Sequence, residues 1–248
     1  MRLKLFIEYD GTQYSGWQKQ QNAKTIQGTL INVIEKLFSK SKGSSKFIDL
    51  QGSGRTDSGV HALEQVAHLE CDTMIAPHIL KIKINDELPS DINILNIEKA
   101  DKNFHARHSA ISRQYLYRIS RRRTAFEKRY VWWIKDDLDI SKIKEASDLF
   151  LGMNDFRSFS DPDGENKSTK VLVESLNIFE EDELILINIK ASHFLWKMVR
   201  RIAGTLVEVG REKIDLLHIK NFLKNHSNIP SKFTAPPSGL FLEKVYYK

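Results

Sequence analysis

The amino-acid sequence predicts an α+β fold with mostly antiparallel strands. Short strands and amphipathic helices follow one another without the regular strand–helix alternation of a parallel sheet. In addition, Val171–Phe179 and Glu183–Ala191 are expected to pair as a hairpin across Glu180–Asp182. With 248 residues, 41% of them apolar, the chain can bury a sizeable core.

The first part of the chain is predicted from the spacing of its apolar residues. Apolar and polar residues alternate over Met1–Tyr9, which predicts a strand. Helical spacing over Thr25–Ser39 predicts a helix capped by Thr25, and the polar segment Ser39–Lys46 is expected to be a loop. The same patterns predict strands at Phe47–Leu50, Gln65–Glu70 and Ile92–Ile97, and a helix at Ala76–Asn85.

The second part of the chain has a similar content of strands and helices. Strands are predicted at Gln114–Ser120, Tyr130–Ile134 and Gly239–Tyr246, and helices over Ile140–Gly152, from about Phe194 onward, and from a capping Asp215 to Asn225. We therefore expect two similar halves, residues 1–102 and 103–248, which divide near Lys102. A central cleft between two such halves is a natural place for a large ligand.

Composition excludes several classes of protein. Cys71 is the only cysteine, which excludes an internal disulfide and a thiolate zinc cluster. No apolar stretch is long enough to cross a bilayer, and the first residues do not form a signal peptide, so a reducing, cytoplasmic setting is expected. The net charge of +6 is by itself weak support for a polyanionic partner.

Basic residues are concentrated in the segment Arg118–Arg129, which reads RISRRRTAFEKR. Six Arg or Lys residues stand there against one acid, Glu127, and Arg107 and Arg113 precede the segment. This pattern is typical of the solvated rim of a loop and also of a nucleic-acid-binding surface. Composition alone does not separate these two interpretations.

The segment Gly52–Ala62 reads GSGRTDSGVHA and is the strongest candidate for a functional site. It is not a dinucleotide-binding loop, because Asp57 stands where the third glycine is needed, and it lacks the Gly-Lys-Ser/Thr ending of a P-loop. The remaining interpretation is a tight turn that brings Arg55 and Asp57 close together. The alternative is a purely structural turn in which Asp57 caps backbone amides and Arg55 is solvated.

Two histidines near this turn, His61 and His68, are weak candidates for a metal site, because no acid lies nearby at ligand spacing. We expect no metal here, and His61 is expected to pack at the start of the following strand.

The run Gly54–Ala62 closely resembles the GRTDxGVHA signature of the tRNA pseudouridine synthase A family, and further matches follow in order along the whole chain. They are Tyr9-Asp10-Gly11, Tyr14, Gly16-Trp17-Gln18, Gln20, Thr25-Ile26-Gln27, Asn85, Leu88-Pro89, Asp91-Ile92, Phe104-His105-Ala106-Arg107, Ser109-Ala110, Arg113, Tyr115, Tyr117, Asn154-Asp155-Phe156, Ser158-Phe159, Phe194-Leu195, Met198-Val199-Arg200, Gly204-Thr205-Leu206, Thr234-Ala235-Pro236 and Gly239-Leu240.

Three positions depart from the family pattern. Glu64 occupies a position usually held by glycine, His108 replaces a phenylalanine, and Lys170, in the run Lys167–Lys170, replaces an arginine. These departures bear on substrate choice rather than on the reaction.

The resemblance implies the roles of the site residues. Asp57 is the nucleophile, and Arg55 helps to extrude the target uridine from the helical stem. Tyr115 stacks on the flipped uracil and assists proton removal, although spacing alone favours a core aromatic at this position. Arg200 pairs with Asp57, and its neighbour Arg201 competes for this role. The residues expected to bind substrate are Arg55, Arg107, Arg113, Tyr115, Arg121, Arg122, Arg123 and Lys197.

The implied activity is the isomerisation of uridine to pseudouridine in the anticodon stem-loop of tRNA, at tRNA positions 38, 39 and 40. Residues 1–248 would form one catalytic unit with the pseudouridine synthase fold, and two copies would form a homodimer. The reaction needs no cofactor or metal, because it involves neither oxidation nor phosphoryl transfer. The alternatives are a catalytically silent RNA-binding protein or tRNA chaperone of the same fold, and a hydrolase that uses Asp57 with Asp86 or Asp91.

Overall fold

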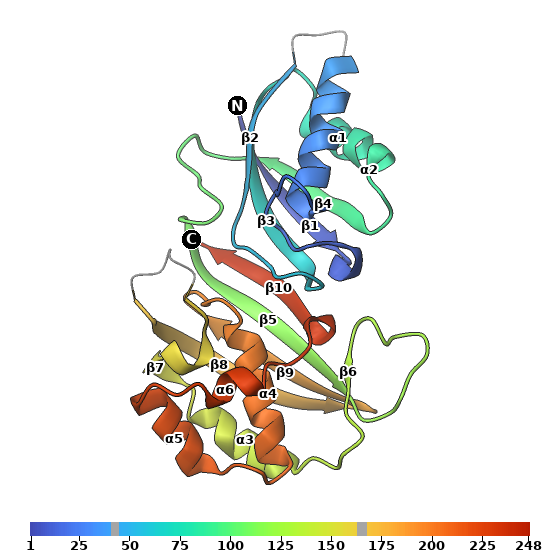
Figure 1. Cartoon of the computed structure of the whole chain (residues 1–248). Coiled ribbons are helices and arrows are strands. Elements are labelled where there is room, and N and C mark those ends of the chain that lie inside the picture. Colours follow the sequence, from blue (N-terminus) through green and yellow to red (C-terminus); the bar gives the residue numbers. More distant parts are fainter. Residues whose placement is uncertain (41–44, 163–167) are drawn as a thin grey trace. The chain divides into compact units, whose positions relative to one another are not determined.

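The computed structural model describes residues 1–40, 45–162 and 168–248, which form two compact units. Unit 1 comprises Met1–Ile111 and Leu242–Lys248, and unit 2 comprises Ser112–Phe241. The chain enters unit 2 within strand β5 (Ala110–Ser120) and returns to unit 1 within strand β10 (Leu240–Tyr247), as the colours of Figure 1 show.

An antiparallel sheet forms the centre of unit 1. Its strands run in the order β4 (Ile92–Lys99), β1 (Arg2–Tyr9) and β3 (His61–Asp72), and both β2 (Lys46–Gly52) and β10 pair with β3. Along β1 every second side chain is buried, because alternate residues of a strand point to opposite faces of the sheet.

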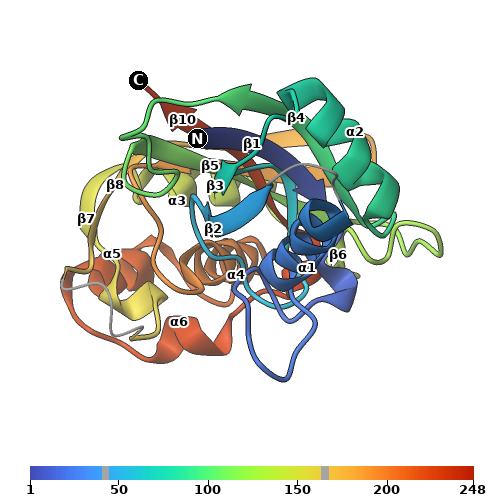
Figure 2. The ribbon, with the colours of Figure 1, turned by 90° about the horizontal axis from the view of Figure 1, so that it is seen from above.

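Two helices cover this sheet. Helix α1 (Ile26–Lys40) contacts β2 and helix α2 (Pro77–Glu87) contacts β4, and the two helices lie side by side (Figure 2). The hydroxyl of Thr25 accepts a hydrogen bond from the Gly28 amide at 3.2 Å, as expected for the residue that caps α1.

Mostly antiparallel strands also form the centre of unit 2. Its strands run in the order β5, β9 (Leu184–Ala191), β8 (Lys170–Glu181) and β7 (Gly152–Asp155), and the short β6 (Trp132–Trp133) pairs in parallel with β5. The helices of this unit are α3 (Ile140–Asp148), α4 (Met198–Gly210), α5 (Leu216–Lys224) and α6 (Ile229–Lys232), with α3 against β8 and α5 against β7 (Figure 1). Within the described residues, short 3-10 helices also lie at Gly11–Gln13 in unit 1 and at Arg157–Phe159 and Pro237–Gly239 in unit 2.

The α+β prediction is confirmed, and so is the hairpin, which turns at Asp182 and Glu183 between β8 and β9. Asp215 caps α5 as predicted, since its carboxylate accepts from the His218 amide at 3.0 Å. His61 is the first residue of β3 and is 1% exposed, which confirms its expected place.

Several predicted boundaries are wrong. The helix expected to begin near Phe194 begins at Met198, because Lys197 has a φ of +63°, which an α-helix cannot continue. The helix expected to reach Gly152 ends at Asp148, and Gly152, with a φ of +82°, begins strand β7 instead.

Two further segments differ from their predictions. Only Trp132–Trp133 of the expected strand Tyr130–Ile134 pairs with β5. Within the loop expected at Ser39–Lys46, the first two residues extend α1 and Lys46 begins β2, while residues 41–44 lie outside the described residues. Lys167 likewise lies outside them, and Lys170 begins β8.

In the described part of the chain, no helix is both long and apolar enough to cross a membrane.

Candidate functional site

The turn that carries Arg55 and Asp57 lies between β2 and β3 of unit 1, and its first residues are anchored to β3. The Ser53 amide donates to the Val66 carbonyl at 2.7 Å, and the Ser53 hydroxyl donates to Gln65 Oε1 at 2.6 Å. The other end of the same Gln65 amide, Nε2, donates to the Gly54 carbonyl at 3.1 Å. The entry into the turn is therefore held by both backbone and side-chain bonds.

Thr56, immediately before Asp57, is held by the first forty residues of the chain. The Trp17 amide donates to the Thr56 carbonyl at 3.1 Å, and the Thr56 hydroxyl shares a buried hydrogen bond of 2.8 Å with the Tyr9 hydroxyl. Gly16 passes so close that a Cβ there would lie 2.5 Å from the Thr56 carbonyl oxygen, and its φ is +88°. Only glycine fits at this position.

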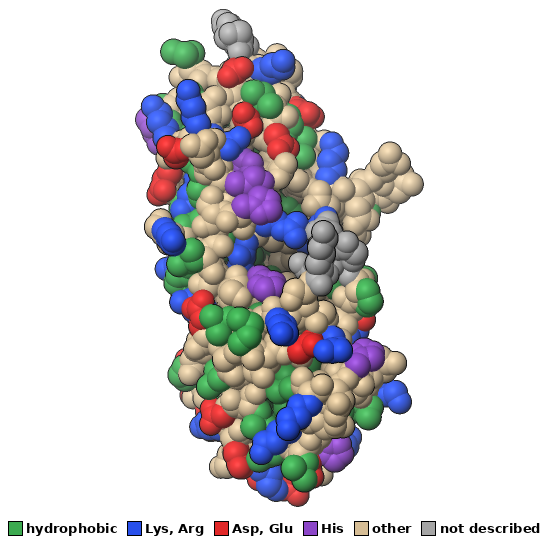
Figure 3. Space-filling view, turned by 90° about the vertical axis from the view of Figure 1, so that its left-hand side faces the viewer, with side chains coloured by type: hydrophobic (Ala, Val, Ile, Leu, Met, Phe, Trp, Pro, Cys, Tyr) green, Lys and Arg blue, Asp and Glu red, His purple; other side chains and the backbone are tan. Residues whose placement is uncertain are grey.

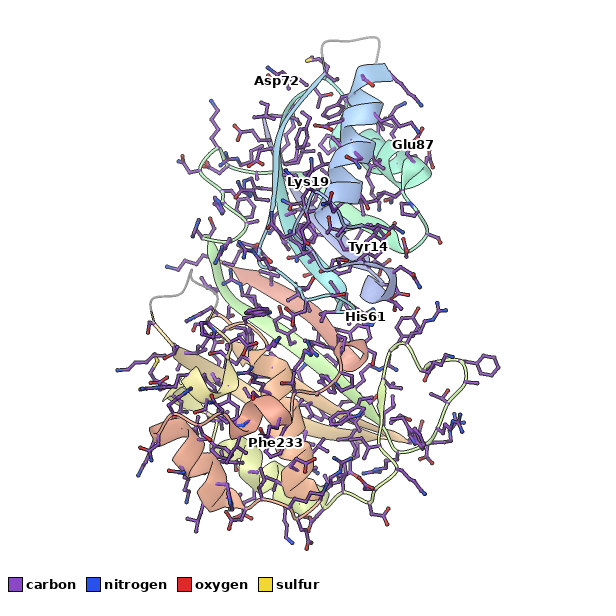
Figure 4. All side chains as sticks on the ribbon, in the orientation of Figure 1. Tyr14, Lys19, His61, Asp72, Glu87 and Phe233 are labelled. Carbon is purple, nitrogen blue, oxygen red and sulfur yellow. The ribbon has the colours of Figure 1, made fainter. Side chains whose placement is uncertain are left out.

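The end of the turn closes on Asp57 itself. The Val60 amide donates to the Asp57 carbonyl at 3.2 Å, which makes residues 57–60 a β-turn, and Gly59 adopts a φ of +77°. The Ser58 hydroxyl donates to the Tyr14 carbonyl at 3.1 Å. Tyr14 and His61, labelled in Figure 4, lie at this end of unit 1. The Asp57 side chain is half-buried and the Arg55 side chain is exposed.

His61 takes part in the same framework. Its Nδ1 accepts from the Gly11 amide at 3.1 Å, and a Cβ on Gly11 would lie 1.9 Å from the Val60 carbonyl oxygen. No group of three or more His, Cys, Asp or Glu side chains among the described residues has the geometry of a metal site.

Arg107 lies in a surface loop of unit 1 that Arg2 holds in place. The Arg2 guanidinium donates from Nη1 to the Lys102 carbonyl at 2.6 Å and to the Phe104 carbonyl at 3.0 Å, and from Nη2 to the Glu70 carboxylate at 3.0 Å. The Arg107 side chain itself is exposed.

Three imidazole rings, tilted against one another, lie in contact beside the same loop. The ring of His68 lies 4.7 Å from that of His105, which lies 4.3 Å from that of His108, and histidine side chains gather on the surface of unit 1 in Figure 3. Burial, with the nearby charges of His105 and Arg2, lowers the pKa of His68 to about 4, so its Nδ1 can accept from the Ala106 amide. The departure at His108 thus adds a third ring to this group of histidines.

In unit 2, Arg113, Tyr115 and Tyr117 follow one another on β5, and the two tyrosines share one face of the strand. Tyr115 is half-buried and packs edge-on against Phe194, with ring centroids 4.9 Å apart at 83°. Tyr117 is completely buried, and its hydroxyl donates to the Pro236 carbonyl at 2.8 Å. Arg113 donates to the Ser192 carbonyl at 3.2 Å.

Three cations, Lys197 just before α4 and Arg200 and Arg201 in its first turn, have different surroundings. Arg201 is 5% exposed and is hydrogen-bonded to the Asp161 carboxylate, to which Lys197 also donates at 2.7 Å. Burial would raise the pKa of Asp161, but the bonds from Lys197 and Arg201 outweigh burial and lower it. Sequence reasoning missed Asp161, because no local pattern links it to residues 36 and 40 positions away.

Arg200 points elsewhere. Its Nε donates to the Ala235 carbonyl at 2.7 Å, and the Ala235 amide donates to the Arg200 carbonyl at 3.1 Å. Nearby, a Cβ on Gly204 would lie 1.5 Å from the carbonyl oxygen of Phe233, which Figure 4 labels beside α4. The segment around Ala235 is thus packed directly on the helix and orients Arg200.

The basic segment after β5 is exposed at Arg121, Arg122 and Arg123. Arg121 is hydrogen-bonded to the Glu180 carboxylate of β8, and the Arg123 guanidinium lies over the Trp133 ring, 5.8 Å from its centroid. Phe126, in the same segment, is 94% exposed.

The candidate residues thus belong to both units: Arg55, Asp57 and Arg107 to unit 1, and the remainder to unit 2. The chain belongs to the tRNA pseudouridine synthase family, whose model matches residues 5–109 and 146–248.

Individual relatives match it over nearly their whole length. The chain is 39% identical to "tRNA pseudouridine synthase A 2" of Clostridium perfringens over 247 residues, which cover 99% of each chain. It is 39% identical over 248 residues to "tRNA pseudouridine synthase A" of Blochmanniella floridana, which cover 99% of this chain and 96% of that one. It is 37% identical to the protein of the same name from Clostridium botulinum strain Alaska E43, with 99% of each covered.

Proposed function

We propose that this protein isomerises uridine to pseudouridine in the anticodon stem-loop of tRNA, at tRNA positions 38, 39 and 40. The observation that carries the proposal is the rigidly held turn with Asp57 at its centre, in a chain that matches relatives named tRNA pseudouridine synthase A from end to end. The test is to map pseudouridine by chemical labelling in cellular RNA with and without the protein. Unchanged labelling at all three positions would reject the proposed substrate.

The proposed reaction breaks the N1–C1′ bond of uridine and forms a C5–C1′ bond. Asp57 provides a carboxylate that can attack carbon and later leave, either at C6 of the ring or at C1′ of the sugar, or it assists formation of a glycal. The proton lost from C5 balances the proton gained at N1, so the product has the mass of the substrate. No electron acceptor or donor enters this balance.

The other candidate residues act on the RNA. A stacked uridine must be extruded before a protein side chain can reach it, and the exposed, planar guanidinium of Arg55 suits this step. We propose that Tyr115 stacks on the face of the flipped uracil and assists removal of the proton from C5. Arg107, Arg113 and Lys197 are proposed to bind the phosphate backbone, together with Arg121, Arg122 and Arg123.

The contacts within unit 2 support Arg200, rather than Arg201, as the partner of Asp57. Arg201 is buried and already bonded to Asp161, whereas the side chain of Arg200 is only half-buried. If Arg200 holds the Asp57 carboxylate, Arg200→Ala should lower product formation while tRNA affinity is largely kept. The measurement is single-turnover product formation at saturating tRNA.

Arg201→Ala is the matched control from the same helical turn. It should change product formation little but lower the free energy of unfolding by about 2 kcal/mol, because the hydrogen bond of Arg201 to the Asp161 carboxylate is lost while Lys197 still pairs with that carboxylate. Since the folded pKa of Asp161 is below its ordinary value of 3.8, this stabilisation is fully present above that value and is lost as the pH falls through the folded pKa. If Arg201→Ala lowers product formation more than Arg200→Ala does, the two roles are exchanged.

The basic segment should govern tRNA affinity more than turnover. Replacing Arg122 and Arg123 by Gln should weaken binding and reduce its salt dependence by roughly one unit of slope per lost phosphate contact. Arg121→Gln should change the slope less, because the Arg121 guanidinium is engaged by Glu180. Binding is measured over a range of salt concentrations, and an unchanged slope in the double variant would remove the segment from the RNA interface.

We further propose that the active protein is a cytoplasmic homodimer that binds tRNA as a dimer. Analytical ultracentrifugation of the protein alone and with tRNA tests this, and a monomer in both samples would reject it. A tritium-release assay on labelled tRNA distinguishes the enzyme from the catalytically silent alternative, because a chaperone would bind the RNA without releasing tritium from it.

A further inference from the structure

A chain of buried polar side chains runs beneath the Asp57 turn. Gln65 is completely buried in β3, where its neighbours Val66, Ala67 and Leu69 are completely buried apolar residues. Both ends of its amide are bonded to the turn, Oε1 to the Ser53 hydroxyl at 2.6 Å and Nε2 to the Gly54 carbonyl at 3.1 Å. A buried amide is costly to desolvate, so its complete pairing is needed to offset that cost.

Tyr9 continues this chain to the residue before Asp57. Tyr9 is 4% exposed, and its hydroxyl shares a hydrogen bond of 2.8 Å with the Thr56 hydroxyl. Burial raises the pKa of Tyr9 well above its ordinary value, while hydrogen bonds with Thr56 and Gln65 oppose the rise. The phenol is therefore neutral. Gln65 thus holds Ser53 and Gly54 at the entry of the turn, and Tyr9 holds Thr56.

The network acts on Asp57 through the backbone. Tyr9 holds the Thr56 side chain, and the Trp17 amide donates to the Thr56 carbonyl at 3.1 Å. Because that carbonyl belongs to the peptide group between Thr56 and Asp57, the two bonds together restrain the orientation of this peptide plane. On its other side, Asp57 is restrained by the Val60 amide, which donates to the Asp57 carbonyl at 3.2 Å, so the two side-chain torsions are the main freedom left to aim the carboxylate. Apolar residues would stabilise this core at least as well. The polar side chains are therefore better explained by the need to position the Asp57 turn precisely.

We propose that Tyr9 and Gln65 are positioning residues for Asp57, which they act on through Thr56 and through the entry of the turn. The inference rests on the proposed function of Asp57. Two buried side chains, one on β1 and one on β3, would thus fix the position of the Asp57 carboxylate without having to contact it.

The test compares Tyr9→Phe, Thr56→Val and their double variant, measured for kcat and KM on tRNA, for tRNA affinity, and for melting temperature. Each single variant removes the same hydrogen bond, so we expect kcat to fall about 10- to 30-fold in each while KM and affinity stay within about twofold. The double variant should be no slower than the worse single variant, because one shared interaction is lost only once. Gln65→Met should lower kcat in the same way.

Tyr247→Phe is the matched control. It also removes a tyrosine hydroxyl bonded inside unit 1, to the Ala106 carbonyl at 2.7 Å, but away from the Asp57 turn. It should lower the melting temperature to a similar degree and leave kcat within about twofold. If Tyr9→Phe loses no more kcat than Tyr247→Phe, or if the losses of Tyr9→Phe and Thr56→Val multiply in the double variant, the proposal is wrong.

The outcome also separates this inference from the proposed function. Wild-type protein that makes no pseudouridine would reject the function itself. A fully active Tyr9→Phe, alongside active wild type and inactive Asp57→Asn, would reject only the positioning role. Should Gln65→Met fail to fold, the comparison of Tyr9→Phe with Tyr247→Phe still decides.

Discussion

Asp57→Asn is expected to reduce pseudouridine formation by at least about 10³-fold while leaving the fold and tRNA binding nearly intact. Asparagine is nearly isosteric with aspartate, and the hydrogen bond that closes the turn is accepted by the Asp57 backbone carbonyl, which the substitution keeps. The amide cannot, however, act as an anionic nucleophile. If Asp57 were only a structural turn residue, the substitution would instead lower stability slightly and leave catalysis normal.

Melting temperature, tRNA affinity and single-turnover product should be measured on one preparation of Asp57→Asn. Asp72→Asn is a suitable control, because it removes a largely exposed carboxylate at the far end of β3. The introduced asparagine precedes Ser58, and its deamidation would restore the carboxylate, so mass spectrometry must first exclude deamidation. If the verified Asp57→Asn variant forms nearly as much pseudouridine as the wild type, the proposed mechanism is wrong.

Tyr115→Phe is expected to reduce turnover by roughly 10²-fold or more with tRNA binding kept, because the hydroxyl is proposed to assist proton removal from C5. Phenylalanine retains the ring that packs edge-on against Phe194, so the local packing of β5 should not change. Turnover is measured by tritium release from the C5 position at saturating tRNA. Full activity would reduce Tyr115 to a surface on which the uracil stacks.

Tyr117→Phe is the matched control, two residues along the same strand. The Tyr117 hydroxyl is bonded to the Pro236 carbonyl in a completely buried position, so its loss should destabilise the protein by about 1–2 kcal/mol. Turnover at saturating tRNA should change little. A larger catalytic loss from Tyr117→Phe than from Tyr115→Phe would mean that the roles of the two tyrosines have been exchanged.

The types of most elements could be predicted from the sequence, because apolar spacing reports directly on which face of a helix or strand is buried. The alternation over β1 and the helical spacing of α1 are both present in the structure. Boundaries set by single backbone conformations were missed. Neither the left-handed Lys197 before α4 nor the left-handed Gly152 at the start of β7 changes the apolar pattern, so periodicity cannot reveal them.

The sequence by itself determined the fold class, the family and the candidate turn, because ordered motifs and apolar spacing are local properties that need no coordinates. The tertiary structure alone decided which distant residues hold that turn. Tyr9 and Thr56 are 47 positions apart, and Arg201 and Asp161 are 40 apart, so no pattern along the chain joins them. Sequence spacing placed Arg200 and Arg201 about 100° apart on a helix. Only the packing of unit 2 directs one of them to Asp161 and the other to Ala235, because side-chain partners depend on the neighbours that folding brings together.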